Sequence, residues 1–101
     1  MINVVASIKV AEGRREDFIK IFLELMPKVH QENGCVEYFP AIDVASDLEV
    51  QDIDINCVTV LEKWQTLDAL KAHLAAPHMD EFRDNTEGMV ESLTLKILQS
   101  A

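Results

Sequence analysis

Residues 58–82, VTVLEKWQTLDALKAHLAAPHMDEF, contain the only tryptophan of the chain and two of its three histidines. The stretch begins with an almost continuous apolar run, which is typical of a strand buried on both faces. Thr66 then offers an N-cap for a helix that has His73 at the border of its apolar face. Pro77 ends that helix and gives the chain a new direction, so this turn could close a pocket. The helix face that we expect to be buried is made of Leu67, Leu70 and Leu74.

The rest of the chain alternates between the periodicities of strands and helices. Apolar residues recur at every second position in residues 2–10, and three and four positions apart in the segment that begins at Glu12. We predict further strands at residues 35–42 and around residues 93–97, and a short helix over residues 79–85. The order strand, helix, strand, strand, helix, strand predicts an α+β, ferredoxin-like βαββαβ fold. In that fold the helices cover one face of a four-stranded antiparallel sheet.

Length and charge restrict the class of protein. We expect residues 1–101 to form a single domain, since a chain of this size has room for one core. The formal net charge of −9 repels nucleic acid and anionic lipid alike, so we expect neither as a partner. No run approaches the roughly 20 apolar residues of a membrane span, and the N-terminus lacks the pattern of a signal peptide. We therefore expect a cytoplasmic protein in which Cys35 and Cys57 are free thiols.

Two features of the pattern favour a partner chain. Residues 43–56 carry five acidic side chains, which indicates either a solvated hairpin extension or an arm that reaches a partner. The sheet face away from the helices would expose Val5, Phe39 and either Leu61 or Val60. An open apolar face of this kind predicts a homodimer with the two sheets packed face to face.

Candidate chemistry is concentrated in residues 58–82. No nucleophile elbow, Walker loop or dinucleotide fingerprint is present. The two cysteines do not form metal-ligand spacings with His73 and His78, so we expect no metal. An imidazole in an apolar pocket can instead remove a proton from a weakly acidic hydroxyl near neutral pH. Structural interpretations compete: Trp64 as a core anchor, His73 as a hydrogen-bond partner of Glu62 or of a carbonyl, and His78 as a helix-start residue.

The segment EKWQTLDALKAHLAAPHMDEF resembles the antibiotic biosynthesis monooxygenase superfamily of small dimeric α+β barrels. Within that superfamily it is most like the bacterial quinol monooxygenases. The likeness extends over nearly the whole chain, through AEGRREDF, ENGCVEYFPAIDVA and LTLKILQ. The pattern around Trp64, His73, Pro77 and His78 carries the superfamily signature, and the long loop of residues 45–56 resembles the quinol-oxidising branch.

The resemblance implies that the chain oxidises a hydroquinone or a similar small aromatic with molecular oxygen, without metal, flavin or other cofactor. Such chemistry needs a base, a dry aromatic pocket and room for oxygen. On this likeness the expected base is His73 or His78, and Glu62 is the carboxylate that orients it. The expected substrate contacts are Tyr38, Trp64, Met79, Phe82 and Arg83.

Other branches of the superfamily fit less well. Polyketide-oxidising members have an asparagine where Val60 stands, and haem-degrading members have an asparagine, a tryptophan and a histidine where Ala6, His73 and Arg83 stand. Two alternatives to quinol oxidation remain. One is an isomerase of a phosphorylated autoinducer sugar, and the other is a non-catalytic stress or regulatory dimer that binds a small apolar ligand. The isomerase needs a cationic phosphate-binding site, and the cations near the candidate pocket are Lys63, Lys71 and Arg83.

Overall fold

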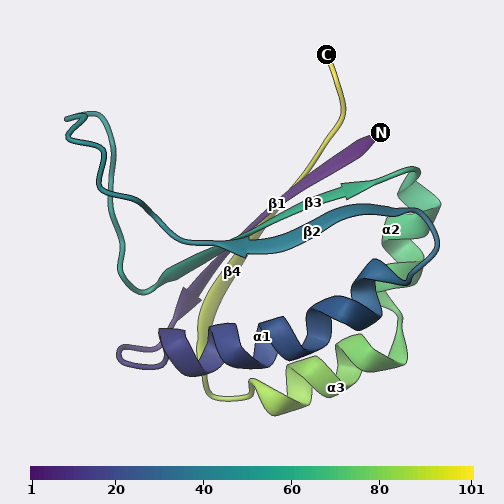
Figure 1. Cartoon of the computed structure of the whole chain (residues 1–101), viewed down its shortest axis with the longest axis horizontal. Coiled ribbons are helices and arrows are strands. Elements are labelled where there is room, and N and C mark those ends of the chain that lie inside the picture. Colours follow the sequence, from purple (N-terminus) through teal and green to yellow (C-terminus); the bar gives the residue numbers. More distant parts are fainter.

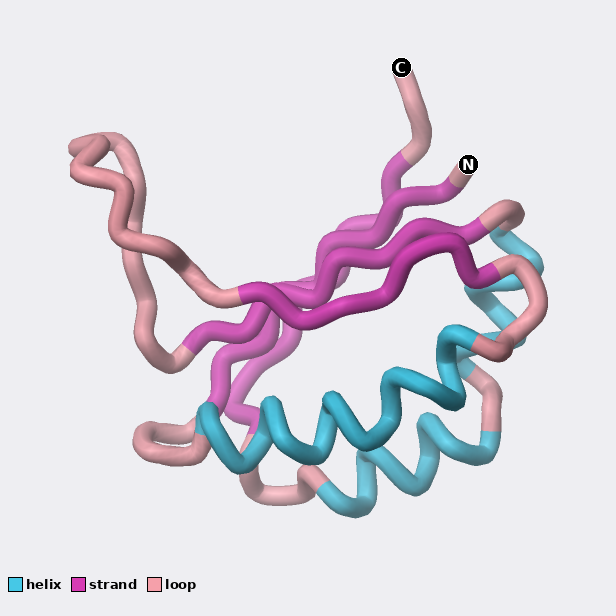
Figure 2. The backbone as a smooth tube through the Cα atoms, viewed as in Figure 1, coloured by secondary structure: helices cyan, strands magenta, loops and turns pink.

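The computed structural model describes all of residues 1–101 and arranges them in two layers (Figure 1). Four strands form one antiparallel sheet in the order β2-β3-β1-β4, and the three helices lie on one side of it (Figure 2). The predicted ferredoxin-like α+β fold is confirmed, with the second helix divided in two. In chain order the elements are β1 (Ile2–Val10), α1 (Arg15–His30), β2 (Cys35–Ala41), β3 (Cys57–Trp64), α2 (Leu67–Leu74), α3 (Pro77–Asn85) and β4 (Val90–Leu98).

The core lies between the sheet and the helices. Alternate residues of β1 and β3 point toward the helices, because side chains of a strand alternate between the two faces of a sheet. Helix α1 meets them with apolar residues three and four positions apart, as its sequence predicts. The fully buried residues of this layer include Val4, Val10, Phe18, Phe22, Val29, Val58 and Trp64.

Helix α2 is rotated relative to the prediction. Thr66 caps it as expected, since its Oγ1 accepts a hydrogen bond from Ala69 N at 3.1 Å. The buried face, however, consists of Leu70 and His73, each 1 % exposed, whereas Leu67 is 43 % exposed. The prediction of a buried face made of Leu67, Leu70 and Leu74 is therefore right for Leu70 and wrong for Leu67 and Leu74, which is 38 % exposed. A histidine takes a core position because, as described below, its ring nitrogen has a buried hydrogen-bond partner.

The pairing of β2 with β3 brings the end of α1 close to the beginning of α2. Cys35 lies opposite Trp64 in the ladder, and Gln65 N donates to the carbonyl of Gly34 at 2.8 Å. Gly34 has a φ of +85°, and a Cβ at this position would lie 2.7 Å from Cβ of Ala69. The turn before β2 therefore packs directly against α2, and this contact positions the site.

Apolar side chains remain exposed at the edge strand β4. Residues Leu93, Leu95 and Ile97 lie opposite inward-facing residues of β1, so they too face the helix side of the sheet. The helices do not cover this edge, and the three side chains are 42–60 % exposed. Strand β4 is thus half-covered on the side that contains the core.

The segment of residues 42–56, which we call the arm, projects away from the helix layer (Figure 1). It contains no strand, so it is not a hairpin extension. Asp43 Oδ2 accepts a hydrogen bond from Asp54 N at 2.9 Å, which ties the two ends of the arm together. The arm carries the exposed apolar side chains Val44, Leu48, Val50, Ile53 and Ile55.

None of the three helices is long and apolar enough to cross a bilayer.

Candidate active site

A cavity of about 350 Å³ opens between the helices and the inner face of the sheet. This volume lies within the range of roughly 300–1,000 Å³ that is usual for small-molecule sites. Its polar groups include Glu62 and His73, and most of its wall is apolar or aromatic. Apolar and aromatic lining residues include Phe22, Tyr38, Val60, Met79, Phe82 and Leu95.

His73 lies in the wall of this cavity with its ring fixed on several sides. Its side chain is 1 % exposed. The ring of Trp64 lies 4.6 Å from it, centroid to centroid, and the ring of Tyr38 contacts it edge-on at 5.3 Å. Tyr38 is in turn stacked on Phe22 at 5.1 Å. An imidazole packed in this way has one orientation, so its two nitrogens face different partners.

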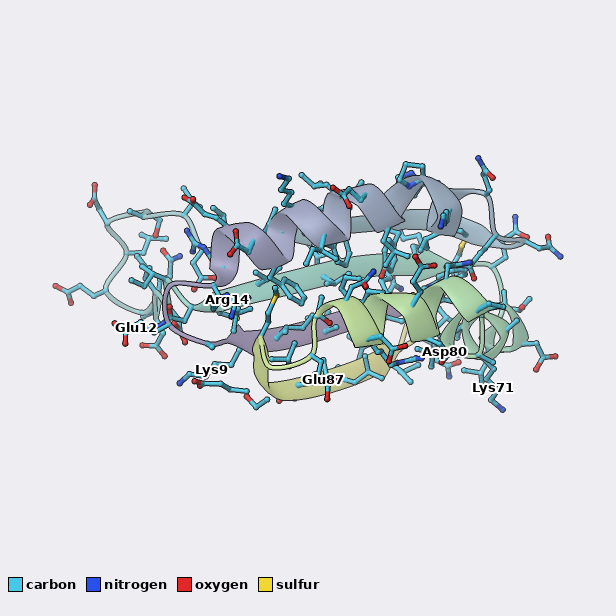
Figure 3. All side chains as sticks on the ribbon, turned by 90° about the horizontal axis from the view of Figure 1, so that it is seen from below. Lys9, Glu12, Arg14, Lys71, Asp80 and Glu87 are labelled. Carbon is cyan, nitrogen blue, oxygen red and sulfur yellow. The ribbon has the colours of Figure 1, made fainter.

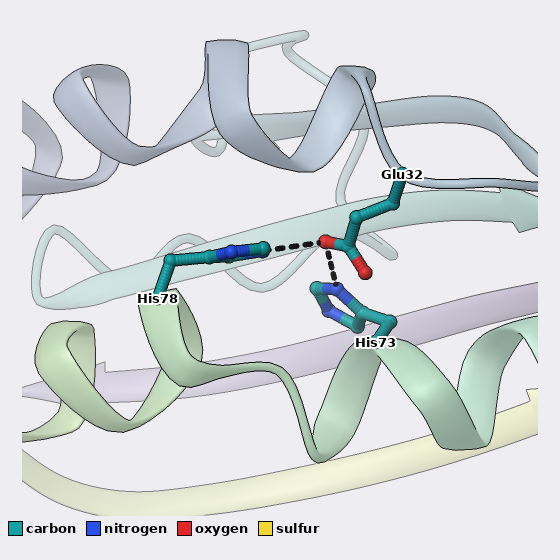
Figure 4. A group of neighbouring side chains, drawn as sticks. All are labelled: Glu32, His73 and His78. Carbon is teal, nitrogen blue, oxygen red and sulfur yellow. Dashed lines mark hydrogen bonds and ion pairs between the residues drawn. The ribbon is translucent and has the colours of Figure 1, made fainter.

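The Nδ1 atom of His73 contacts Glu32, a residue of the turn between α1 and β2. The Nδ1–Oε2 distance is 2.8 Å (Figure 4). An ionised carboxylate only accepts hydrogen bonds, so the proton of this bond belongs to Nδ1 of the imidazole. In the neutral ring, Nε2 is then the nitrogen with a free lone pair. Glu32 thus selects the tautomer in which Nε2 of His73 is the basic atom.

His78 contacts the same oxygen of Glu32 from another direction. Its Nε2 atom lies 2.8 Å from Glu32 Oε2, and its side chain is 21 % exposed. It lines a separate groove between α1 and α3, of about 120 Å³. In an unbroken helix, residues five apart would point about 140° away from each other. Pro77, the first residue of α3, changes the helix direction and allows His73 and His78 to converge on one carboxylate.

On its other side His73 faces Glu62, with 3.9 Å between Nε2 and Oε1. The indole N–H of Trp64 donates to the same oxygen of Glu62 at 2.9 Å. Burial raises the pKa of the Glu62 carboxyl, while the hydrogen bond from Trp64 and the charge of His73 oppose that rise. Glu62 is therefore a buried, oriented carboxyl beside the basic nitrogen.

The structure brings most of the predicted site residues to one cavity, but not all of them. Tyr38, Glu62, His73, Met79, Phe82 and Arg83 line it. Trp64, which we expected to contact the substrate, and His78, which we expected as an alternative base, do not line it, so both expectations are wrong for this cavity. Trp64 is fully buried behind His73, where it acts as a core anchor and as the hydrogen-bond donor to Glu62.

Arg83 lines the cavity, but its guanidinium is already bound to protein groups. Nη1 donates to Asp80 Oδ1 at 2.8 Å, and Nη2 donates to the carbonyl of Leu74 at 2.9 Å. These bonds join the last turn of α2 to α3. The side chain therefore fixes the angle between the two helices that hold His73 and His78.

The two thiols are free, and Cys35 lies close to the carboxylates of the site. Burial raises the pKa of the Cys35 thiol, and the negative charges of Glu32 and Glu62 raise it further. A thiol that keeps its proton is a poor nucleophile. Cys35 therefore contributes packing near the site rather than reactivity.

Glu32 is the residue of this cluster that the sequence pattern does not predict. It stands in a polar turn, 41 residues before His73, and no periodicity connects the two. The signal that could have identified it is topological. In a βαββαβ fold with β2 paired antiparallel to β3, the residues just before β2 and just after β3 lie together at the same ends of these two strands.

Comparison with known proteins points to one family. The family model described as antibiotic biosynthesis monooxygenase matches residues 1–85. The Escherichia coli K12 protein named probable quinol monooxygenase YgiN is 31 % identical over 101 residues, which span 98 % of this chain and 97 % of that protein. A Shigella flexneri protein of the same name matches equally well.

Solved structures agree in fold. The protein PA3566 from Pseudomonas aeruginosa matches with a TM-score of 0.82 at 21 % identity, covering 99 % of this chain and 93 % of that one. A conserved protein from Methanosarcina mazei Go1 matches with a TM-score of 0.83 at 20 % identity, covering 99 % and 92 %. At these identities the two structures speak to the fold alone.

Proposed function

The chain belongs to the antibiotic biosynthesis monooxygenase family, and from this premise we propose that it oxidises a quinol or a similar small aromatic with molecular oxygen. The 31 % identity to the Escherichia coli protein named probable quinol monooxygenase YgiN supports this substrate class. The cavity described above supports it independently, because its wall is rich in aromatic and aliphatic side chains and it has the volume of a small-molecule site.

The observation that carries the proposal is the Glu32–His73 pair at the wall of that cavity. The 2.8 Å bond to Nδ1 leaves Nε2 as the acceptor of a proton from the substrate hydroxyl. Removal of that proton creates an electron-rich phenolate, which transfers an electron to oxygen more readily than the neutral quinol does. Tyr38 and Phe82 would contact the flat ring of the substrate. His78 would hold Glu32 in place from outside the cavity.

The overall reaction balances in two forms that differ in product. In a monooxygenation, the quinol and one O₂ give a hydroxyquinone and one water molecule. In a simple oxidation, the quinol and one O₂ give the quinone and one hydrogen peroxide. We propose the first, in keeping with the family to which the chain belongs.

An isomerase acting on a phosphorylated sugar is less compatible with the site. The cavity contains Glu62 and Glu87, and Arg83 already binds Asp80. Lys63 pairs with Glu37 at 3.9 Å, and Lys71 lies on the outside of α2 (Figure 3). A phosphate would therefore meet carboxylates without a free cation.

We also propose that the protein is a homodimer formed through the outer face of the sheet. On this face Phe39, Leu61 and Val5 are neighbours across three strands, and Phe39 is 40 % exposed. Val60, the alternative considered from the sequence, is buried on the inner face. Light scattering after size exclusion should give twice the mass of the chain, and Leu61→Lys should give the mass of one chain. If the wild-type protein has the mass of one chain at micromolar concentration, this dimer is excluded.

Oxygen uptake with a reduced naphthoquinol tests the function. We expect a rate above autoxidation for the wild type, and a loss of about 10²-fold or more in His73→Ala, because general-base catalysis is worth about 10²–10⁴-fold. His78→Ala should lose less, and Glu16→Gln, at an exposed position in the first turn of α1, should keep the wild-type rate. A wild-type rate equal to that of buffer would end the proposal.

Product analysis and ligand binding complete the test. Hydroxyquinone without peroxide supports monooxygenation, whereas quinone with one equivalent of peroxide refutes that step. A panel of quinones and sugar phosphates, read by the shift in melting temperature, separates the alternatives. Stabilisation by quinones without oxygen uptake would indicate the non-catalytic ligand-binding dimer, and stabilisation by sugar phosphates would indicate the isomerase.

A further inference from the structure

The cluster formed by Glu32, His73 and His78 has the composition of a metal site as well as that of a hydrogen-bonded triad. One carboxylate oxygen and two imidazole nitrogens, one from each residue, lie within 4.8 Å of one another (Figure 4). We propose that these three residues bind one divalent transition-metal ion, with Zn²⁺ as the ion that best matches two imidazoles and a carboxylate. The third ligand, Glu32, is not evident from the sequence, because it lies in a turn 41 residues before His73.

The spacing of the donor atoms suits an ion of this size. Around a tetrahedral Zn²⁺ with bonds of about 2.1 Å, neighbouring ligand atoms are about 3.4 Å apart. The two contacts of Glu32 Oε2, at 2.8 Å each, would have to lengthen by about 0.6 Å. The two ring nitrogens, which lie within 4.8 Å of each other, would have to adopt the same spacing. The side chains that would move are Glu32 and His78, because both lie partly outside the rigid core, at 14 % and 21 % exposure.

The surroundings of the cluster have the features of a metal's outer shell. The nitrogen of His73 that does not face Glu32 lies 3.9 Å from the carboxylate of Glu62, which is longer than a hydrogen bond, so the ring would have to move closer when the ion binds. Metal-binding histidines usually donate their second ring N–H to such a carboxylate. The indole N–H of Trp64 holds Glu62 in place at 2.9 Å. In this arrangement Glu62 would orient His73 toward the ion.

Charge and access also favour a cation. Glu32 forms ion pairs with His73 and His78, and no lysine or arginine is paired with it. With both imidazoles neutral, the cluster carries the negative charge of Glu32. His78 lines the groove between α1 and α3, where Lys28 pairs with Glu81 at 4.0 Å, and the side chain of Glu32 is 14 % exposed. An ion would therefore approach from the outside of α1 and α3 rather than through the substrate cavity. A water molecule from this groove would complete a four-coordinate site.

Metal binding would have a consequence for catalysis, which rests on the proposed function. An ion bound to Nδ1 of His73 displaces the proton from that nitrogen. The neutral ring then carries its proton on Nε2, the atom that would otherwise accept a proton from the quinol. Bound metal is therefore expected to inhibit quinol oxidation.

Direct binding measurements test the site without reference to activity. The full chain, stripped with EDTA and dialysed, is titrated with Zn²⁺ by calorimetry, and with Cu²⁺ while the fluorescence of Trp64 is recorded. Trp64 is the only tryptophan and lies 4.6 Å from the His73 ring, so quenching reports on this location. We expect one Zn²⁺ per chain and stoichiometric quenching by Cu²⁺.

Variants distinguish binding of Zn²⁺ at this cluster from binding of Zn²⁺ to carboxylates on the acidic surface. We expect Glu32→Gln and His78→Asn to abolish stoichiometric binding, and Glu62→Gln to weaken it about 10–100-fold, the usual cost of losing an outer-shell partner. His30→Asn, which removes the histidine outside the cluster, should bind like the wild type. His78 is partly exposed, so His78→Asn is expected to fold even if Glu32→Gln does not. Absence of one-to-one binding in the wild type, or equal affinity in folded His78→Asn, would overturn the proposal.

Discussion

Replacing Glu32 by glutamine removes one negative charge while preserving the shape of the side chain. The carboxylate oxygen Oε2 accepts from His73 Nδ1 and from His78 Nε2, each at 2.8 Å. The amide of Gln offers one oxygen and one NH₂ group, and the NH₂ group cannot accept a hydrogen bond. Where the NH₂ group faces His73, Nδ1 becomes the acceptor and the proton moves to Nε2. The ring then has no lone pair directed toward the cavity.

The expected loss follows from these contacts. If the variant populates mainly the wrong tautomer, most of the general-base contribution disappears, and kcat should fall about 10²–10³-fold, equivalent to about 2.7–4 kcal/mol. Hydrogen bonds to a charged group are worth about 1.5–3 kcal/mol each and those to a neutral group about 0.5–1.5 kcal/mol. Two such bonds at a carboxylate that is 14 % exposed give an expected loss of about 2 kcal/mol in the free energy of unfolding.

Two measurements on the same sample decide the outcome. Steady-state oxygen uptake should show a reduced kcat at a nearly unchanged KM, because Glu32 does not line the cavity. Urea unfolding should show the loss of stability with an unchanged slope. Glu16→Gln, the same substitution at an exposed position in the first turn of α1, is the control and should change neither. The decisive variant is Glu32→Ala, because the amide oxygen of Gln can also take the place of Oε2 and accept from both rings. A folded Glu32→Ala protein that keeps more than half of the wild-type kcat would refute the role of Glu32.

Further expectations concern the packing around the site. Trp64→Phe removes the hydrogen bond to the buried Glu62 and part of a fully buried ring, and should cost about 2–4 kcal/mol in urea unfolding; a loss below 1 kcal/mol would contradict the anchoring role. Burial, and then the charges of Glu62 and a second glutamate, raise the pKa of Tyr38, the only tyrosine, so ultraviolet titration of the native protein should show no phenolate at pH 11. Because the unfolded chain ionises near pH 10 and the folded chain does not, stability should fall as pH rises above about 10, by up to about 1.4 kcal/mol per pH unit; phenolate in the native protein at or below pH 11 would be the contrary result. Gly34→Ala combines a left-handed backbone with a clash and should lower stability by about 2–4 kcal/mol, whereas Gly13→Ala, with a φ of +79° but open space, should lose only about 1 kcal/mol; equal losses would show that the contact of Gly34 is unimportant.

The fold could be predicted because its signals are local. The alternation in residues 2–10 and the apolar run before Trp64 correspond to β1 and β3. Thr66 marks the start of α2 and Pro77 the start of α3, since a cap and a proline act within one helical turn. Each of these signals depends on neighbours in the sequence, so a single chain contains the information.

The site was only partly predictable because it depends on contacts between distant segments. Most cavity residues lie in the predicted stretch, but the partner of His73 lies 41 residues earlier in a turn. That same contact rotates α2, so that His73 rather than Leu67 is buried. Trp64 could not be assigned to the core or to the cavity from its position on a strand. Its place depends on what packs behind the strand, and sequence periodicity does not contain that information.

The half-covered edge strand β4 has a practical consequence for handling the protein. Its outer backbone groups have no neighbouring strand, and its exposed apolar row lies next to them. Such an edge is a template on which a strand of another molecule can add, the first step of ordered aggregation. The net charge of −9 opposes this step by repulsion between molecules, and salt screens that repulsion beyond about 10 Å at 0.1 M. Concentrated stocks should therefore stay clear longest in buffers of low ionic strength, well above the isoelectric point near pH 4.6.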